Sequence, residues 1–312
     1  MPDLIKIILI VLGVILSQYV LFMLILSYAL YVAHLKRTSK KKWTRECSSD
    51  DPVQLHMYNE GLQWSESFID KKKDLHMIND GLNLYAEYCD LGSKNTAIIV
   101  SGRTEGLRYA YYFAKPYTDM GWNVLCIDQR AHGNSDGKYN TLGFNEHKDI
   151  IKWADLLKTD FNVENVVLHG ICIGASASIF ALTSENRSSV FAGFVAEGMY
   201  PCFIESFRNH MIELKHPTTP CVQCVDMWMR ILTGFTMTYG PKNVIDRLEV
   251  PLLMLHSKED LYSLPEEAQK LYDKCNSDKQ LEWFEHGKHS QLRYTDGEHY
   301  DSAVRSFIER HF

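Results

Sequence analysis

One short segment of the sequence combines a nucleophilic side chain with the glycines needed to expose it. Cys172 lies between Gly170 and Gly174, directly after the apolar run 166–169 and before a stretch rich in Ala and Ser. A sharp turn from a strand into a helix requires residues without Cβ atoms on both sides of the nucleophile. The free N–H groups at the start of such a helix stabilise an anion. The segment therefore predicts a thiol nucleophile held in a tight turn.

A carboxylate and a histidine that could serve this thiol follow it in the chain. Asp260 comes after the apolar run 252–256, and His289 comes after the strand-like run 280–284. Because the carboxyl ends of parallel strands meet at one edge of a sheet, both side chains could reach Cys172 from neighbouring loops. His289 would take the proton from sulfur, and Asp260 would orient the imidazole and stabilise its cation.

Two neighbours compete for these roles. His286 precedes His289 by three positions, and Glu259 directly precedes Asp260. We favour His289 because it lies deeper in its loop, and we favour Asp260 for its place between the apolar strand and the next helix. Glu197 comes directly after the predicted strand 191–196 and remains open as an alternative acid or a substrate-binding residue.

The elements that must position these residues alternate along the chain. A hairpin is expected over 74–88, with Asn79-Asp80-Gly81 supplying the positive φ angles of its turn. Strands that form one sheet are then expected at 96–101, 123–128, 166–169, 191–196, 252–256 and 280–284, separated by helical stretches. Such alternation predicts an α/β protein with a mostly parallel sheet and helices on both faces.

Several separated motifs in this order resemble the α/β-hydrolase superfamily, from about Leu75 to Phe312. More closely, the chain is similar to a bacterial lysophospholipase-like and serine-aminopeptidase-like branch, some of whose members carry an N-terminal membrane helix. Residues 128–137, DQRAHGNSDG, match that branch's D-x-R-G-H-G-x-S-x-G turn, with Ala131 for the first glycine. The resemblance implies an α/β-hydrolase fold with a helical cap, in which Cys172 stands where such proteins normally carry serine.

The resemblance also implies an oxyanion hole made of two backbone N–H groups. One belongs to the residue after the nucleophile, which is Ile173. The other comes from the loop after the first buried strand, where we assign Arg103. That loop lacks the usual histidine before its glycine, so Thr104 stays open as the second donor.

The stretch from about 198 to 240 replaces a simple crossover and is rich in Phe and Met. We expect it to form a helical cap over the site. Met227, Trp228 and Phe235 are the residues expected to bind an apolar or aromatic part of a substrate. Ordinary packing inside the cap is an equal alternative for them.

Residues 4–33 are almost continuously apolar, which exceeds the roughly 20 residues that a spanning helix needs and the shorter apolar run of a cleaved signal peptide. Basic residues follow this run: Lys36, Arg37, Lys40, Lys41, Lys42 and Arg45. The positive-inside rule therefore predicts a single-pass membrane protein with its large domain in the cytoplasm. We expect an anchor over 1–35, a basic juxtamembrane linker with a short helix over 36–74, and the hydrolase domain over 75–312.

Charge and cysteine content indicate which classes of ligand the protein is expected not to bind. The net charge of −6 and the lack of a basic stripe in the globular part argue against a nucleic-acid partner. Cys221 and Cys224 form a CxxC pair, but a structural zinc site needs four ligands and no second pair lies nearby, so we expect no metal. No organic cofactor is implied either.

These patterns predict a hydrolase that cleaves an ester, a thioester or an amide through a covalent acyl-enzyme on Cys172. The anchor and the apolar cap favour a lipophilic or acylated substrate, and peptides remain a second option. The alternative is a non-catalytic, membrane-tethered module that binds or senses a ligand on the same scaffold. A third hypothesis, ranked last, makes Cys172 a redox-sensing thiol.

Overall fold

A single eight-stranded sheet forms the centre of the molecule in the computed structural model, which describes residues 2–47 and 49–312. Its strand order is β1-β2-β4-β3-β5-β6-β7-β8. The β1–β2 and β2–β4 pairs are antiparallel, and all the other neighbouring strands are parallel. The strands are Lys72–Asn79 (β1), Leu82–Cys89 (β2), Asn95–Val100 (β3), Asn123–Asp128 (β4), Asn165–Ile171 (β5), Phe191–Glu197 (β6), Leu252–Ser257 (β7) and Lys279–Phe284 (β8).

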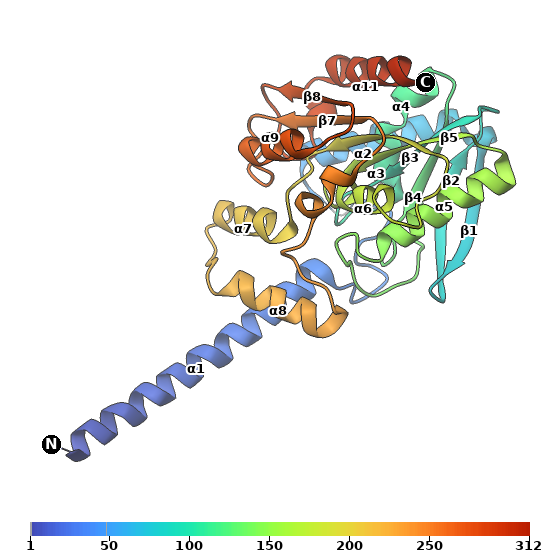
Figure 1. Ribbon diagram of the computed structural model, residues 1–312. Coiled ribbons are helices and arrows are strands. Elements are labelled where there is room, and N and C mark those ends of the chain that lie inside the picture. The colour runs from blue at the N-terminus through green and yellow to red at the C-terminus, as the bar shows by residue number, and fades with distance from the viewer. Residues whose placement is uncertain (1, 48) are drawn as a thin grey trace.

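Helices cover both faces of this sheet (Figure 1). On one face pack α5 (Glu146–Phe161), α6 (Ile173–Leu182) and α9 (Pro265–Lys274). On the other pack α2 (Pro52–Ser67), α3 (Leu107–Ala110), α4 (Lys115–Asp119), α10 (Leu292–Thr295) and α11 (Gly297–His311). The predicted α/β class, the opening hairpin and the positions of the strands along the chain are confirmed.

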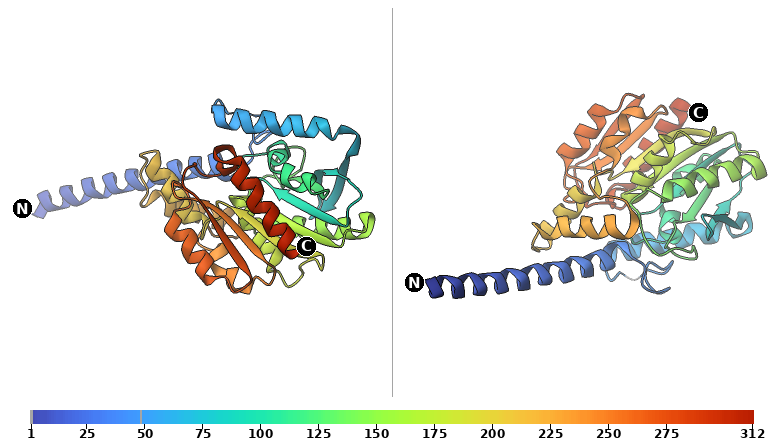
Figure 2. Two further views of the ribbon diagram at one scale, coloured as in Figure 1. Left: turned by 90° about the horizontal axis from the view of Figure 1, so that it is seen from above. Right: turned by 60° about the horizontal axis from the view of Figure 1, so that its bottom comes forward.

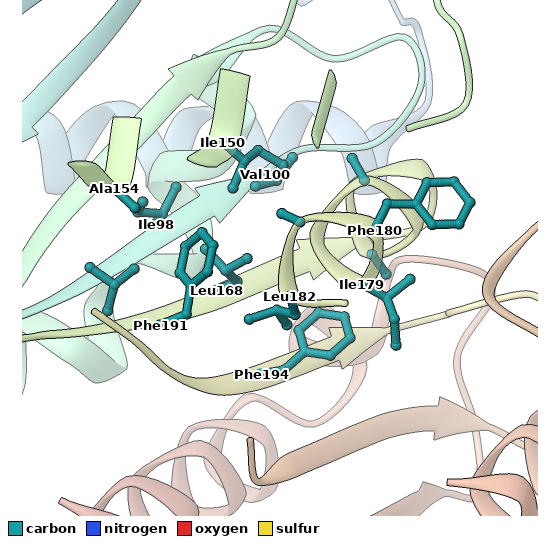
Figure 3. Packing of buried hydrophobic residues seen from close by; sticks show 14 of the residues in the cluster. Ile98, Val100, Ile150, Ala154, Leu168, Ile179, Phe180, Leu182, Phe191 and Phe194 are labelled. Carbon is teal, nitrogen blue, oxygen red and sulfur yellow. The ribbon is translucent and has the colours of Figure 1, made fainter. Parts of the chain in front are cut away.

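The strands at the centre of the sheet are apolar on both sides because both faces are covered. In β3, Ile98 and Val100 point into the core with α5 and α6, whereas Ala97 and Ile99 point into the core with α3. Figure 3 shows Val100 beside Ile150 and Ile98 beside Ala154, two residues of α5. All four strand residues are fully buried. A strand buried on both faces reads as a continuous apolar run rather than an alternating one, as this segment does.

The turn at residues 128–137 ties β4 to the rest of the domain. The Asp128 carboxylate accepts hydrogen bonds from Leu107 N at 2.7 Å and Asn134 N at 2.9 Å, and it pairs with Arg45 Nε at 2.9 Å. Ala131, which replaces the glycine of the resembling motif, adopts a φ of 66°. The turn therefore keeps its left-handed backbone without the glycine that usually provides it.

The first helix, α1 (Pro2–Leu35), projects from the domain as a long rod (Figures 1 and 2). Asp3–Leu35 is long and apolar enough to cross a membrane. Over the outer part of the rod, side chains such as Leu9, Ile10 and Leu16 are more than 60% exposed in the isolated chain. Toward its end, Tyr31 and Leu35 are fully buried. The rod thus changes from an uncovered apolar helix into part of the domain's core.

That inner end packs with two helices between β6 and β7, in the stretch that we expected to form a cap. These are α7 (Phe203–Glu213) and α8 (Cys221–Thr233). Tyr31 and Leu35 belong to one apolar cluster with Phe207 of α7 and with Val225 and Met229 of α8. Figure 2 shows α8 lying alongside α1 from a second direction. The end of α1 and the cap therefore share one core.

The segment expected to be a juxtamembrane linker packs against the domain. Trp43 is 6% exposed, stacks on the ring of His132 at 4.8 Å, and accepts a backbone hydrogen bond from Gly133 N. Arg37 donates to Ser135 O at 3.0 Å and to Gly133 O at 2.8 Å. The short helix expected within this linker is α2, and it too packs against the domain. Residues 36–47 are therefore packed on the turn at 128–137 rather than held away from the domain.

Trp43→Ala tests this packing. Removing a large buried aromatic side chain leaves a cavity, and we expect the free energy of unfolding to fall by about 3 kcal/mol. Lys41→Ala, at an exposed position of the same segment, is the matched control and should change little. Chemical denaturation of the full chain measures both variants. Equal stability of the two would mean that the segment behaves as a tether only.

Candidate active site

Cys172 occupies the turn between β5 and α6. Its backbone angles are φ 55° and ψ −113°, and its N–H donates to Glu197 O at 2.9 Å. A cysteine with positive φ is strained and persists only where its surroundings hold it. A Cβ on Gly174 would lie 2.0 Å from Val100 O, so the start of α6 touches the end of β3. The predicted strand–turn–helix context of the thiol is present, and its side chain is partly exposed.

His289 and Asp260 form a buried pair beside this turn. His289 Nδ1 lies 2.7 Å from Asp260 Oδ2, and their side chains are 11% and 2% exposed. The other oxygen, Oδ1, accepts hydrogen bonds from Tyr262 N at 2.8 Å and Ser263 N at 2.9 Å. These bonds fix the carboxylate, which in turn fixes the imidazole ring.

The charges of this pair depend on each other. Burial by itself lowers the pKa of His289, but the charge of Asp260, then that of Cys172, outweigh burial and hold this pKa well above its usual value. Burial by itself raises the pKa of Asp260, and the charge of His289 and its hydrogen bond bring this pKa below the usual value. The pair therefore favours an imidazolium beside a carboxylate.

The two competing residues lie elsewhere. His286 Nδ1 contacts Glu259 Oε1 at 3.1 Å, and both side chains are more than half exposed. This surface pair does not line the cavity described next. The structure thus brings His289 and Asp260, rather than His286 and Glu259, to the turn that carries Cys172.

A cavity of about 170 Å³ joins the thiol and the imidazole. Its lining comes from α2, the loop after β3, the thiol turn, α7 and the loops after β7 and β8. The lining residues are Gln54, Gly102, Arg103, Thr104, Glu105, Cys172, Phe203, Ser206, Phe207, His210, Tyr262, His289 and Ser290. His289 Nε2 is buried and forms no well-aligned hydrogen bond with any residue that the structure describes. That nitrogen can therefore exchange a proton with Cys172 or with a bound substrate.

A glycine makes room for the imidazole. Gly198, directly after β6, has a φ of 59°, and a Cβ built on it would lie 3.0 Å from Cε1 of His289. The ring therefore packs on bare backbone at the end of β6. In the sequence, the signal for this approach was the position of Gly198, two residues after the end of the predicted strand 191–196.

The two expected oxyanion donors belong to two segments that meet at the thiol turn. The N–H of Ile173 is in the first turn of α6, where helical N–H groups have no partner within the helix. The N–H of Arg103 bonds to no described residue, whereas Gly102 N donates to Glu105 Oε2 at 3.0 Å. His132 Nε2 contacts the carbonyl of Arg103 and steadies the loop. Thr104 lines the same cavity and stays open as an alternative donor.

The cap residues expected to bind substrate have other contacts. Trp228 Nε1 donates to Ser27 Oγ at 3.1 Å and its ring packs on Tyr28, so it faces α1. Phe235 stacks on Phe144 with ring centroids 4.5 Å apart. Neither of them lines the cavity at Cys172, and nor does Met227. From the cap, α7 contributes the lining instead.

Glu197 lies beneath the site and supports the loop of His289. It is fully buried, and it accepts hydrogen bonds from Tyr300 OH at 2.7 Å and from Leu292 N at 3.3 Å. Burial raises its pKa to about 7. Asp260 rather than Glu197 bonds to the imidazole, so Glu197 holds the loop that follows His289.

Comparison with known proteins places the chain in a family. No protein-family model matches it. Over 220 residues it is 32% identical to the uncharacterized protein YqkD of Bacillus subtilis, covering 69% of this chain and 71% of the relative. The chain belongs to the YqkD family.

Solved structures show the fold of this YqkD-family member. The Pyrococcus furiosus esterase Pf2001 aligns with a TM-score of 0.66 at 22% identity, covering 86% of this chain and 98% of the esterase. Est1E of Butyrivibrio proteoclasticus, solved with ferulic acid, aligns with a TM-score of 0.60 at 18% identity, covering 76% and 98% of the two chains. The expected α/β-hydrolase fold is therefore confirmed.

Gly174→Ala tests the contact between the thiol turn and β3. The new Cβ would collide with the Val100 carbonyl, and overpacking of a buried site typically costs about 1–3 kcal/mol. We expect the free energy of unfolding to fall by about 3 kcal/mol. Gly297→Ala is the control, because no atom lies within 4 Å of its new Cβ. That variant should be as stable as the wild type or slightly more so. Similar losses in both variants would contradict a special contact at Gly174.

Asp260→Asn tests the buried pair through the pH dependence of unfolding. The raised pKa of His289 gives stability that is complete below about pH 6.5 and is lost as pH rises through the folded value. The lowered pKa of Asp260 gives stability that is complete above about pH 4 and is lost as pH falls. The variant should therefore lose most, about 3 kcal/mol, between these limits, and less at alkaline pH.

Glu259→Gln is the control for that measurement, since it removes only the exposed pair with His286. It should leave the pH dependence as in the wild type. A loss in Asp260→Asn that is the same from acid to alkaline pH would contradict the charged pair.

Proposed function

We propose that this protein is a membrane-anchored hydrolase that cleaves an ester or thioester through an acyl-enzyme on Cys172. The observation that carries the proposal is the buried His289–Asp260 pair, whose free imidazole nitrogen faces the cavity that Cys172 also lines. A thiol on a strained turn, an oriented base and two unpaired N–H groups are the parts that acyl transfer requires. The esterases among the structural neighbours share the scaffold on which these parts lie.

The reaction follows from this arrangement. The proton of Cys172 passes to His289 before the sulfur attacks the carbonyl carbon as a thiolate, and Asp260 stabilises the imidazolium. The tetrahedral oxyanion is held by the N–H groups of Ile173 and Arg103. Collapse expels the alcohol or thiol, which takes the proton from His289, and leaves a thioester on Cys172. Water then attacks this thioester with His289 as base, and the acid is released with the free thiol.

The N-terminal helix indicates where the protein acts and which kind of substrate it meets. The apolar helix and the basic residues after it favour a single-pass protein with the hydrolase domain on the cytoplasmic side. The inner end of α1 lies in the same apolar cluster as Phe207, which lines the cavity. This arrangement keeps the site close to the membrane surface and favours a lipophilic or acylated substrate, in keeping with the lysophospholipase-like resemblance. No cofactor enters the proposed reaction.

Hydrolysis of p-nitrophenyl esters of increasing chain length tests the proposal on the full chain in detergent. Cys172→Ala and His289→Ala should each lower kcat/KM at least 1000-fold, because acylation needs the sulfur and the base together. His286→Ala, which alters only the exposed pair, should retain wild-type kinetics.

A wild type that hydrolyses no ester or thioester, with a Cys172 that no acylating probe modifies, would favour the ligand-binding module instead. Loss of probe labelling after mild peroxide, with no turnover beforehand, would favour the redox-sensing thiol.

A further inference from the structure

Arg103 contributes more than its backbone to the cavity. Its Nη1 donates to His34 Nδ1 at 2.9 Å and to His34 O at 3.3 Å, in the last turn of α1. Its Nε and Nη2 bond to no residue that the structure describes. Neither nitrogen is buried. These two nitrogens are therefore accessible, and Arg103 lines the cavity at Cys172.

No acidic side chain neutralises this charge. Among residues 2–47 and 49–312, no carboxylate lies within 4.0 Å of the Arg103 guanidinium. Glu105 lines the same cavity, but its carboxylate accepts the N–H of Gly102. Burial also raises the pKa of Glu105, which weakens its negative charge. A half-buried cation without a counter-ion is unfavourable, and a bound anion would stabilise it.

A second unpaired donor lines the same cavity. His210 Nδ1, on α7, is buried and has no hydrogen-bond partner among the described residues. Burial, with the charge of Arg103 added, lowers the pKa of His210, so the ring is neutral and one of its nitrogens can donate. The ring packs against Tyr262 at 4.7 Å and near His34 at 6.0 Å, which fixes its direction.

We propose that Arg103 and His210 form a subsite for a phosphate monoester group carried by the substrate. The proposal rests on the proposed function, because it places this group next to the ester that Cys172 would attack. Arg103 Nε and Nη2 offer the paired donors that match two phosphate oxygens, and His210 offers a third. A phosphate monoester carries up to two negative charges where a carboxylate carries one, so it compensates the unpaired guanidinium more fully.

The position of the subsite relates it to the membrane helix. Arg103 bridges the last turn of α1 and the loop that follows β3, and Phe203 and Phe207 line the apolar part of the cavity. A ligand with a phosphate at Arg103 would therefore lie between the end of the anchor and the thiol. Both an anionic lipid headgroup and a water-soluble phosphate-bearing ester present this chemistry.

The test compares esters that differ only in the phosphate, using the full chain in detergent. The soluble pair is 1-butyrylglycerol 3-phosphate and 1-butyrylglycerol, and the lipid pair carries an oleoyl chain instead. In at least one of these two pairs, the wild type should hydrolyse the ester with the phosphate at a kcat/KM at least tenfold higher than the ester without it. A preference confined to the oleoyl pair identifies a lipid headgroup, and a preference in the butyryl pair identifies a soluble ester.

Variants assign that preference to the subsite. Arg103→Met should reduce the phosphate preference at least tenfold, and His210→Phe, which keeps a ring of similar size, should reduce it several-fold. Glu105→Gln should preserve or increase it, because Gln still accepts from Gly102 N while the negative charge is gone. Arg310→Met, on the exposed face of α11, is the control and should leave it unchanged. A preference near one in wild type, or one that Arg103→Met leaves intact, would overturn the subsite.

Binding separates the subsite from the proposed reaction. Inorganic phosphate should bind to Cys172→Ala in calorimetric titration, and the double variant that also carries Arg103→Met should lose this binding. Phosphate binding of this kind without turnover of any ester would support the subsite and contradict the hydrolase. Turnover of both esters with equal efficiency and no phosphate binding would support the hydrolase and overturn the subsite.

Discussion

The close approach of the thiol turn to the end of β3 is the constraint on which the site depends. Gly174 lies so near the Val100 carbonyl that no Cβ fits between them. This contact sets the start of α6 beside the end of β3, so Cys172 and Arg103, which come from two separate segments, line one cavity. Strands β7 and β8 then end at the same edge of the sheet and deliver Asp260 and His289. Each chemical group lies in the segment that follows a strand end.

The long apolar helix α1 is a component of the domain as well as a candidate membrane span. Tyr31 and Leu35 are fully buried among cap residues, and a buried side chain of this size typically contributes about 1.5–3 kcal/mol. Lys42 donates to the carbonyls of Val32 and Lys36 and thereby caps the end of the helix. The contact between Arg103 and His34 extends this coupling to the loop at the thiol. The inner end of α1 therefore helps to shape the cavity.

Much of this architecture follows from patterns that are local in the sequence. Apolar runs bounded by turns predicted the strands, and the loops that follow them contained the buried pair. Contacts between distant segments did not follow, because amphipathic periodicity does not identify a partner. Trp228 looked like pocket lining, yet its indole N–H bonds to α1. The helical stretch expected between the strands at 96–101 and 123–128 divides into α3, a 3-10 turn and α4, with Pro116 near the start of α4, since packing against the sheet outweighs local helix preference.

The central claim is that Cys172 carries the acyl group during turnover, and mass spectrometry of acid-quenched protein tests it most directly. During turnover of a cleaved ester or thioester, a Cys172 peptide should gain the mass of the acyl group, and neutral hydroxylamine should remove it. His289→Ala should abolish the adduct, whereas His286→Ala should retain it. An adduct on another residue, or turnover without any adduct in wild type and in variants that slow deacylation, would contradict the account.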